Sequence, residues 1–164
     1  MGVVRGRTPV SDTTEDQEAF STFAREVEPR IRRALIAAFG PEVGTDAAAE
    51  AMAIAWQRWS TVSTRPNPAG YLWGIGRNLA RKRVSRQRRL FPPPDPQREP
   101  WIEPALPAAV EGLTENQRAA VFLVHGFQWT YREAADVLGV STSTVQAHVE
   151  RGMTKLREGL GVEQ

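Results

Sequence analysis

The feature that most constrains this fold is the stretch from Tyr131 to Arg151, which has the pattern of two helices joined by a tight turn. Gly139 allows the positive φ that such a turn needs. Ser141 stands where the second helix needs an N-cap. The apolar residues of that second helix recur on one face at helical spacing: Val145, Val149, Met153 and Leu156. The pattern predicts a helix-turn-helix, and the alternative is a helical hairpin in which these residues only pack.

The other face of the second helix is polar and would point towards DNA, because helix-turn-helix units place this helix in the major groove. Gln146 can bind adenine through two hydrogen bonds, while a neutral His148 adds little attraction to phosphate. Cationic side chains suit contacts with the DNA backbone, which fix the position of the protein on the duplex without reading the base sequence. The candidate duplex-binding residues are Arg132, Thr144, Gln146, Ala147, His148, Arg151 and Lys155.

Composition excludes several classes of protein. A chain of 164 residues has room for one or two small domains. It has no cysteine and only two isolated histidines, so we expect no disulfide, no metal site and no cofactor. The first twenty residues lack an apolar run, and no stretch is long enough to span a bilayer. These features predict a cytoplasmic protein without a membrane partner.

Positive charge is concentrated away from the helix-turn-helix. Seven of the thirteen residues from Arg77 to Arg89 are basic, and Glu50 is the only acid between Ala47 and Pro94. From Ala108 onward, acids outnumber bases by seven to five. This distribution suggests a second surface that binds a polyanion.

The chain is predicted to be all-α, with two small helical domains. Seven prolines in residues 90–107 cannot lie in a helix interior or a central strand, so we expect an extended linker there. A proline-rich ligand for an aromatic groove is the less common alternative. The predicted organisation is a disordered leader at 1–14, an N-terminal domain at 15–89, the linker at 90–107 and a C-terminal domain at 108–161.

Helix boundaries follow from apolar spacing and from Gly and Pro positions. In the N-terminal domain we expect helices at Thr14–Phe39 with a kink or break at Pro29, at Thr45–Trp59 with Thr45 as N-cap, and at Pro68–Arg89, with a loop at Ser60–Pro68. In the C-terminal domain we expect helices at Ala108–Gly112, Glu115–His125 and Tyr131–Leu138 before the second helix of the helix-turn-helix.

The third N-terminal helix combines aromatic, amide and basic side chains, which suit the capture of unpaired bases. Stacking on an aromatic ring contributes ~1–3 kcal/mol per base, and such capture can offset the cost of opening a duplex. Alternatively, the aromatic residues belong to the core, and the basic run is a solvated face or a membrane-surface helix. The candidate strand-binding residues are Tyr71, Trp73, Arg77, Asn78, Arg81 and Lys82.

Three motifs in this order resemble a known family. NPAGYLWGIGRNLARKR at residues 67–83 resembles the promoter-melting segment of bacterial sigma factors of the extracytoplasmic-function class, within the sigma-70 family. LTENQRAAVFLV at residues 113–124 and TVQAHVER at residues 144–151 are similar to the last helices of those proteins. The resemblance covers about residues 17–160. It implies a transcription initiation factor, not an enzyme, that recognises the −35 and −10 promoter elements and promotes DNA melting.

The resemblance also implies partners: core RNA polymerase and promoter DNA, with an anti-sigma factor left open. In the family, an acidic pattern with a glutamine on the second helix binds polymerase. Asp46 and Glu50 match its acids, while Ala49 replaces the glutamine. The same acids would also favour the dipole at a helix N-terminus.

Two other classes of function remain possible on the residues alone. A stand-alone helix-turn-helix regulator of the response-regulator output type would explain residues 140–149 but would leave the segment around Arg77 and Asn78 unexplained. A recombinase with a DNA-binding tail would need a nucleophile among converging charges, and no such arrangement suits it.

Overall fold

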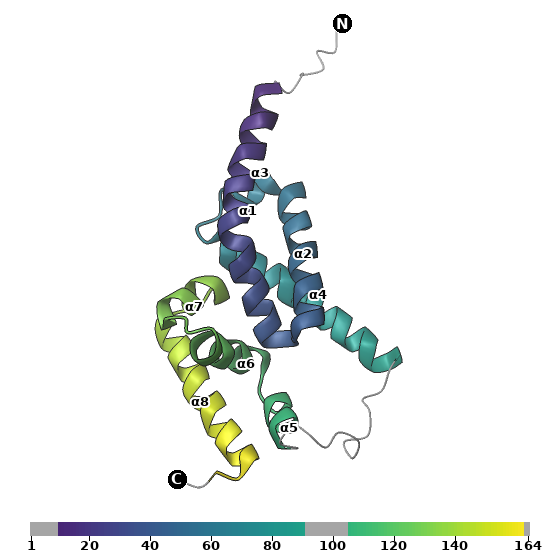
Figure 1. Cartoon of the computed structure of the whole chain (residues 1–164). Helices are drawn as coiled ribbons and strands as arrows, with labels where there is room; N and C mark the ends of the chain where they lie inside the picture. Colours follow the sequence, from purple (N-terminus) through teal and green to yellow (C-terminus); the bar gives the residue numbers. More distant parts are fainter. Residues whose placement is uncertain (1–9, 91–104, 163–164) are drawn as a thin grey trace, which may run out of the picture.

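The structure is a computed structural model that describes residues 10–90 and 105–162, and within these residues every regular element is a helix (Figure 1). The all-α prediction is confirmed. The N-terminal lobe consists of α1 (Val10–Phe39), α2 (Pro41–Gln57), α3 (Trp59–Val62) and α4 (Pro68–Leu90). The C-terminal lobe consists of α5 (Ala105–Glu111), α6 (Glu115–Val121), the π-helix η2 (Phe122–Gly126), α7 (Tyr131–Leu138) and α8 (Thr142–Leu160).

The long helix α1 is the central element of the N-terminal lobe. Its core stripe repeats at helical spacing, and every member is buried: Val27, Ile31, Ala34, Leu35 and Ala38. Helices α2 and α4 both pack on α1 and on each other. The helix runs without interruption from Val10 to Phe39 and includes Pro29, so the predicted break does not occur.

The predicted N-cap at Thr45 is wrong, because α2 begins at Pro41. Gly40 adopts a left-handed φ of 87° at the N-cap position. Pro41 then occupies the first turn, where its missing N–H is not needed and its fixed φ suits a helix. Three residues on, Gly44 brings α2 against the backbone of α1 at Leu35 and Ile36.

Two further boundaries in the N-terminal lobe differ from expectation. Helix α1 starts at Val10, so residues 10–14 of the expected leader are helical; a helix nucleated by a buried stripe extends at little cost per residue. Residues 1–9 lie outside the described part. The short helix α3 begins at Trp59 and extends into the expected loop at Ser60–Pro68, and its Val62 is fully buried.

The linker prediction can be compared with the structure only at its ends. Leu90 completes α4, and α5 begins at Ala105 rather than at Ala108, so both ends of the expected linker are helical. Pro107 is tolerated in α5 because the first turn of a helix has no intrahelical acceptor for its N–H groups. The remaining linker residues, 91–104, lie outside the described residues.

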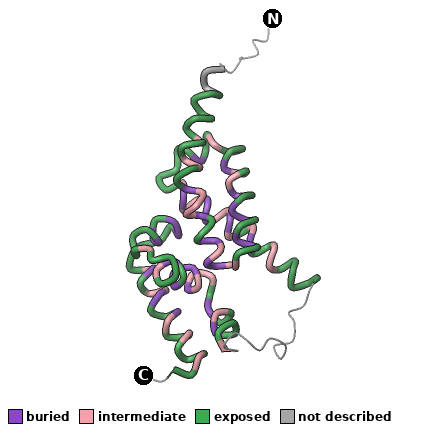
Figure 2. The backbone as a smooth tube through the Cα atoms, in the orientation of Figure 1, coloured by how far each residue is buried: buried purple, intermediate pink, exposed green. Residues whose placement is uncertain are grey.

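The two lobes pack against each other. Helices α6, η2 and α7 contact α1, and α7 also contacts α4 (Figure 1). Buried residues form one continuous cluster that includes Leu35 of α1, Leu72 of α4 and Leu123 of η2. Figure 2 shows buried segments inside each lobe and where the lobes meet, with exposed backbone at the outer ends.

The close contact at Gly44 generates a prediction. Gly44→Ala would place Cβ within 2.6 Å of the Ile36 Cα and the Leu35 carbonyl carbon, so helix α1 or α2 must shift. We expect a loss of about 1–3 kcal/mol of unfolding free energy, as for overpacking, measured by urea denaturation. The control is Gly74→Ala, where nothing lies within 4 Å and alanine should stabilise α4 by about 0.5–1 kcal/mol. Equal stability of the two variants would contradict the α1–α2 contact.

Candidate nucleic-acid interfaces

The helix-turn-helix prediction is confirmed at its caps and its turn. Gly139 ends α7 in the left-handed conformation, with φ 67° and ψ 32°. The Ser141 hydroxyl accepts the backbone N–H of Thr144 at 3.2 Å and caps α8. At the start of α7, Thr130 and Glu133 form a reciprocal capping box. Both helices are therefore fixed at their ends by side chains that lie close in sequence.

The apolar face of α8 is buried as its spacing predicts. Val145 is fully buried, Val149 is 3% exposed, and Met153 packs partly buried against the same core. Gly152 allows α6 to approach α8, since a Cβ there would lie 2.7 Å from the Val121 Cγ2. Packing on α5, α6 and α7 thus sets which face of α8 remains outside.

The predicted duplex-binding residues divide into exposed and partly buried side chains. Gln146, Arg151, Lys155 and, on α7, Arg132 are exposed, while the smaller Thr144 and Ala147 lie partly buried with His148. The Gln146 Nε2 donates to the Glu150 Oε1 at 3.0 Å along the helix. The Gln146 amide thus has the exposed Glu150 as its hydrogen-bond partner, and it would have to leave this partner in order to bind a base.

The His148 imidazole sits at the edge of this face. Partial burial lowers its pKa below the ordinary value, and the positive charge of Arg151 lowers it further. The ring is therefore neutral at pH 7, in agreement with the expectation that it adds little electrostatic attraction.

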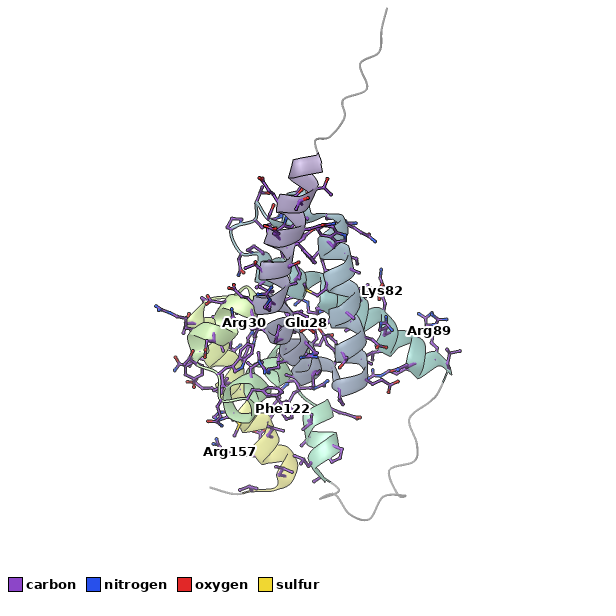
Figure 3. The ribbon with its side chains drawn as sticks, turned by 45° about the horizontal axis from the view of Figure 1, so that its top comes forward. Glu28, Arg30, Lys82, Arg89, Phe122 and Arg157 are labelled. Carbon is purple, nitrogen blue, oxygen red and sulfur yellow. The ribbon has the colours of Figure 1, made fainter. Side chains whose placement is uncertain are left out.

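Most of the predicted strand-binding residues share an accessible side of α4. Asn78, Arg81 and Lys82 are exposed, and Tyr71 and Arg77 are partly exposed. The C-terminal half of α4 extends away from the lobe, although Ala80 is buried and Val84 still packs against the core. Lys82 and Arg89 lie along this projecting half (Figure 3). Basic residues line a shallow groove there: Arg81, Lys82, Arg86 and Arg89, with Ser85.

The prediction for Trp73 is wrong, because its side chain is only 3% exposed and belongs to the core. It lies on the apolar stripe of α4 with Ala69, Leu72, Gly76 and Ala80. A buried ring offers no face to a base, so Tyr71 is the accessible aromatic residue of the predicted set.

The structure adds one residue that sequence reasoning missed. The Arg65 guanidinium lies over the Tyr71 ring, with 4.4 Å between its Cζ and the ring centroid. Both are partly or fully exposed, so this is a cation–π contact at the surface. In the sequence, the feature that could have indicated this contact is a single arginine in the loop before α4. A nucleic-acid base stacking on Tyr71 would have to displace Arg65 or join it.

The acids predicted to bind polymerase are paired within the chain. The Arg83 guanidinium of α4 reaches Asp46 Oδ2 at 3.3 Å and Glu50 Oε2 at 2.8 Å. One cation binds both carboxylates, so the acids share a face of α2 as expected. All three side chains are at least 40% exposed, and such surface pairs contribute only about 0–1 kcal/mol.

The described residues contain no cluster of three or more metal-ligating side chains and no helix long and apolar enough to cross a membrane. They offer two polar helical surfaces instead, one on α8 and one on α4.

Comparisons with known proteins agree with this geometry. Residues 104–156 match the family model described as sigma-70, region 4. A search of curated proteins gives no match. The structure of sigma factor RpoE in complex with the anti-sigma factor NepR, from Bartonella quintana, matches over 90% of this chain and 99% of that chain, with 21% identity and a TM-score of 0.57.

A second solved structure, that of CnrH in complex with the cytosolic domain of CnrY, has 25% identity and a TM-score of 0.56. It covers 90% of this chain and 91% of that one. Together with the order of the motifs, these matches confirm the resemblance seen in the sequence. Residues 104–156 thus match sigma-70 region 4, and the fold of the whole chain resembles those of the two matched structures.

The environment of His148 predicts that the stability of the folded protein depends on pH. Its pKa in the folded state lies below the ordinary 6.5, so the unfolded chain takes up a proton more readily than the folded one. The folded state should therefore lose stability as the pH falls below about 6.5, and no such loss occurs at higher pH. Nuclear magnetic resonance titration of the ring should give a midpoint below 6.5, and His148→Gln should remove this part of the pH dependence. A midpoint at or above 6.5 would contradict the burial of the ring.

Proposed function

We propose that this protein is a sigma factor of the extracytoplasmic-function class, which binds core RNA polymerase, recognises the −35 and −10 promoter elements and promotes DNA melting. The observation that carries the proposal is the pairing of a capped helix-turn-helix, with its polar face exposed, with a basic helix that presents an accessible tyrosine. The protein supplies recognition and strand capture, while the chemistry of RNA synthesis belongs to the polymerase.

The upstream element is read by α8 in the major groove. Gln146 exchanges its bond to Glu150 for a base edge, and Thr144, Ala147 and His148 lie beside it on the helix. Arg132, Arg151 and Lys155 contact phosphates and fix the register of the helix on the duplex. Because few cations lie on this face, sequence preference depends more on base edges than on phosphate attraction.

The downstream element is captured as an opened strand along α4. Tyr71 offers a stacking face, and Asn78 offers an amide to a base edge. Arg77, Arg81 and Lys82 hold the strand backbone. The Arg77 Nε is buried and has no hydrogen-bond partner within the described residues, so an incoming acceptor would satisfy a donor that is otherwise costly. Trp73 supports this surface from the core.

Polymerase docking uses Asp46 and Glu50 on α2. Their pairing with Arg83 is exposed and weak, so a cationic polymerase surface can replace that arginine. The matched RpoE and CnrH structures each hold a second protein, and we extend this to the chain as an anti-sigma partner. A factor that works on polymerase and the chromosome acts in the cytoplasm.

Asn78→Ala provides the test of strand capture. A base-edge hydrogen-bond pair is worth about 1–3 kcal/mol, so promoter opening by the reconstituted polymerase should fall by about tenfold. Permanganate reactivity of thymines in the −10 element measures the opening. Binding of the isolated upstream duplex should be unchanged.

The matched control is Gln87→Ala, which removes an exposed amide from the same helix outside the proposed contact set. Opening should stay at the wild-type level with this variant. Wild-type opening by Asn78→Ala itself would remove Asn78 from the strand-binding surface.

A further inference from the structure

Glu150 is an acid on the exposed face of α8, among residues predicted to bind DNA. Ala147, Glu150 and Thr154 follow one another at spacings of three and four residues, so they share one side of the helix. Val145 and Val149 lie on the opposite side, where they are buried. The fold therefore directs the exposed Glu150 side chain towards the surface that the proposed function places in the major groove.

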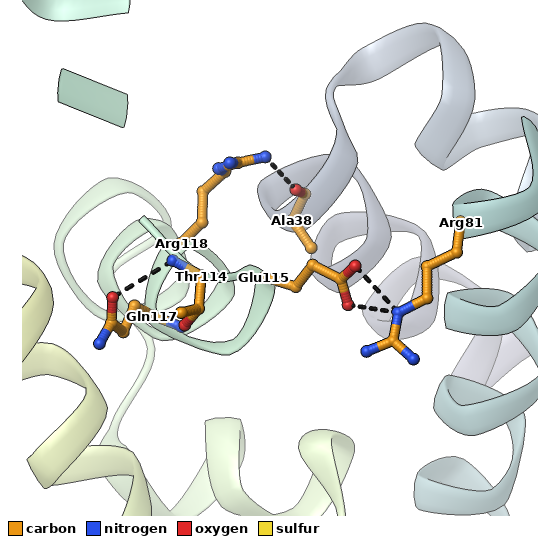
Figure 4. A network of polar contacts seen from close by, with 6 residues as sticks. All are labelled: Ala38, Arg81, Thr114, Glu115, Gln117 and Arg118. Carbon is orange, nitrogen blue, oxygen red and sulfur yellow. Dashed lines mark hydrogen bonds and ion pairs between the residues drawn. The ribbon is translucent and has the colours of Figure 1, made fainter. Parts of the chain in front are cut away.

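The Glu150 carboxylate has no cationic partner within residues 10–90 and 105–162. Other acids of the chain do: the Arg81 Nε, for example, binds both carboxylate oxygens of Glu115 at 2.7 and 2.9 Å (Figure 4). The Glu150 Oε1 instead accepts a hydrogen bond from the neutral amide of Gln146, at 3.0 Å. The negative charge of Glu150 is thus balanced by no cation in the described part of the chain.

Glu150 lies between the base-reading side and the phosphate-binding side of α8. At about 100° per residue, Gln146 stands on one side of it, and Arg151 and Lys155 stand on the other. Glu150 and these two cations line the same shallow groove. When the cations contact phosphates and Gln146 contacts a base edge, the Glu150 carboxylate must also face the edge of a base pair.

The chemistry of the major groove limits what this carboxylate can bind. A carboxylate only accepts hydrogen bonds, and the donors that base pairs present in the major groove are the N6 amino group of adenine and the N4 amino group of cytosine. Guanine and thymine present acceptors, and phosphates repel a negative charge. Gln146 suits adenine, which it binds through two hydrogen bonds, and a glutamate suits the cytosine N4 group.

We propose that Glu150 is a second base-reading residue of α8, which accepts a hydrogen bond from the N4 amino group of a cytosine. The inference rests on the proposed function of α8. Glu150 lies four residues from Gln146, roughly 6 Å along the helix axis at 1.5 Å per residue. Base pairs are about 3.4 Å apart. The cytosine therefore lies one or two base pairs from the adenine that Gln146 reads.

Glu150 selects by exclusion as well as by attraction. Where the cytosine is absent, its carboxylate loses water, faces an acceptor on the base edge and is repelled by the phosphates, so the wrong sequence is disfavoured. In the protein without DNA, the hydrogen bond between Gln146 and Glu150 satisfies both side chains. Binding to the matching sequence replaces this one bond with bonds from both side chains to bases.

The test uses holoenzyme assembled from core polymerase and the full chain, with a library of promoter duplexes randomised in the upstream element. Wild-type holoenzyme should enrich duplexes that carry a cytosine one or two base pairs from an enriched adenine. Glu150→Gln should move the preference at that position from cytosine to adenine, because an amide pairs with adenine N6 and N7. Glu150→Ala should lose the preference at that position and keep the preference for the adenine.

The matched control is Glu158→Gln. It removes the same charge from an exposed residue of α8 about two turns beyond Glu150, and it should leave every base preference unchanged.

A second measurement changes only the DNA. Replacing the enriched cytosine with 2-pyrimidinone removes its amino group alone, and this should weaken binding of the wild-type holoenzyme by about tenfold. The Glu150→Ala holoenzyme should bind the two duplexes equally.

Two results would overturn the role of Glu150: enrichment of the same bases by wild-type and Glu150→Ala holoenzymes, or an equal loss of binding by both on the 2-pyrimidinone duplex. Enrichment by the wild type of an upstream sequence without that cytosine would overturn it as well. A holoenzyme that enriches no upstream sequence, or a chain that does not bind core polymerase, would contradict the proposed function itself and this inference with it.

Discussion

The buried stripe of α1 is the interaction on which the rest of the structure depends. Ile31, Leu35 and Ala38 are fully buried, and the helix that carries them contacts α2, α4, α6, η2 and α7. The two lobes thus share one apolar cluster, and the charged contacts at Arg81 and Arg118 lie around it. Apolar burial supplies the stabilisation, while the polar groups at the margin decide which surfaces meet.

The candidate functional residues lie on the surfaces that this packing leaves exposed. The polar face of α8 and the projecting half of α4 stay exposed, so both remain accessible to a nucleic acid. The first turn of α4, in contrast, lies under the helix-turn-helix turn. Three sets of charged or polar side chains already have partners in the free protein: Asp46 and Glu50 with Arg83, Arg81 with Glu115, and Gln146 with Glu150. Each of these pairs is exposed, so binding can exchange it for an external partner at little cost.

The features of the helix-turn-helix that nearby residues set could be predicted from the sequence, and features set by tertiary contacts could not. The cap at Ser141, the turn at Gly139 and the bounds of α7 follow from side chains within three or four positions. The burial of Trp73 and the contact of Arg65 with Tyr71 depend on how α4 is rotated against α1 and on the path of a loop. The packing of the two lobes on each other could not be predicted either, because the sequence of a proline-rich linker gives no information about contacts between the lobes that it joins. The candidate residues on α8 and most of those on α4 nevertheless lie at accessible surfaces.

The most direct test of this account is transcription by core RNA polymerase with and without the purified protein. Run-off reactions on a library of promoter fragments should yield discrete transcripts that begin at defined positions only when the protein is present. A protein that neither associates with the polymerase nor changes where transcripts begin would contradict the central claim.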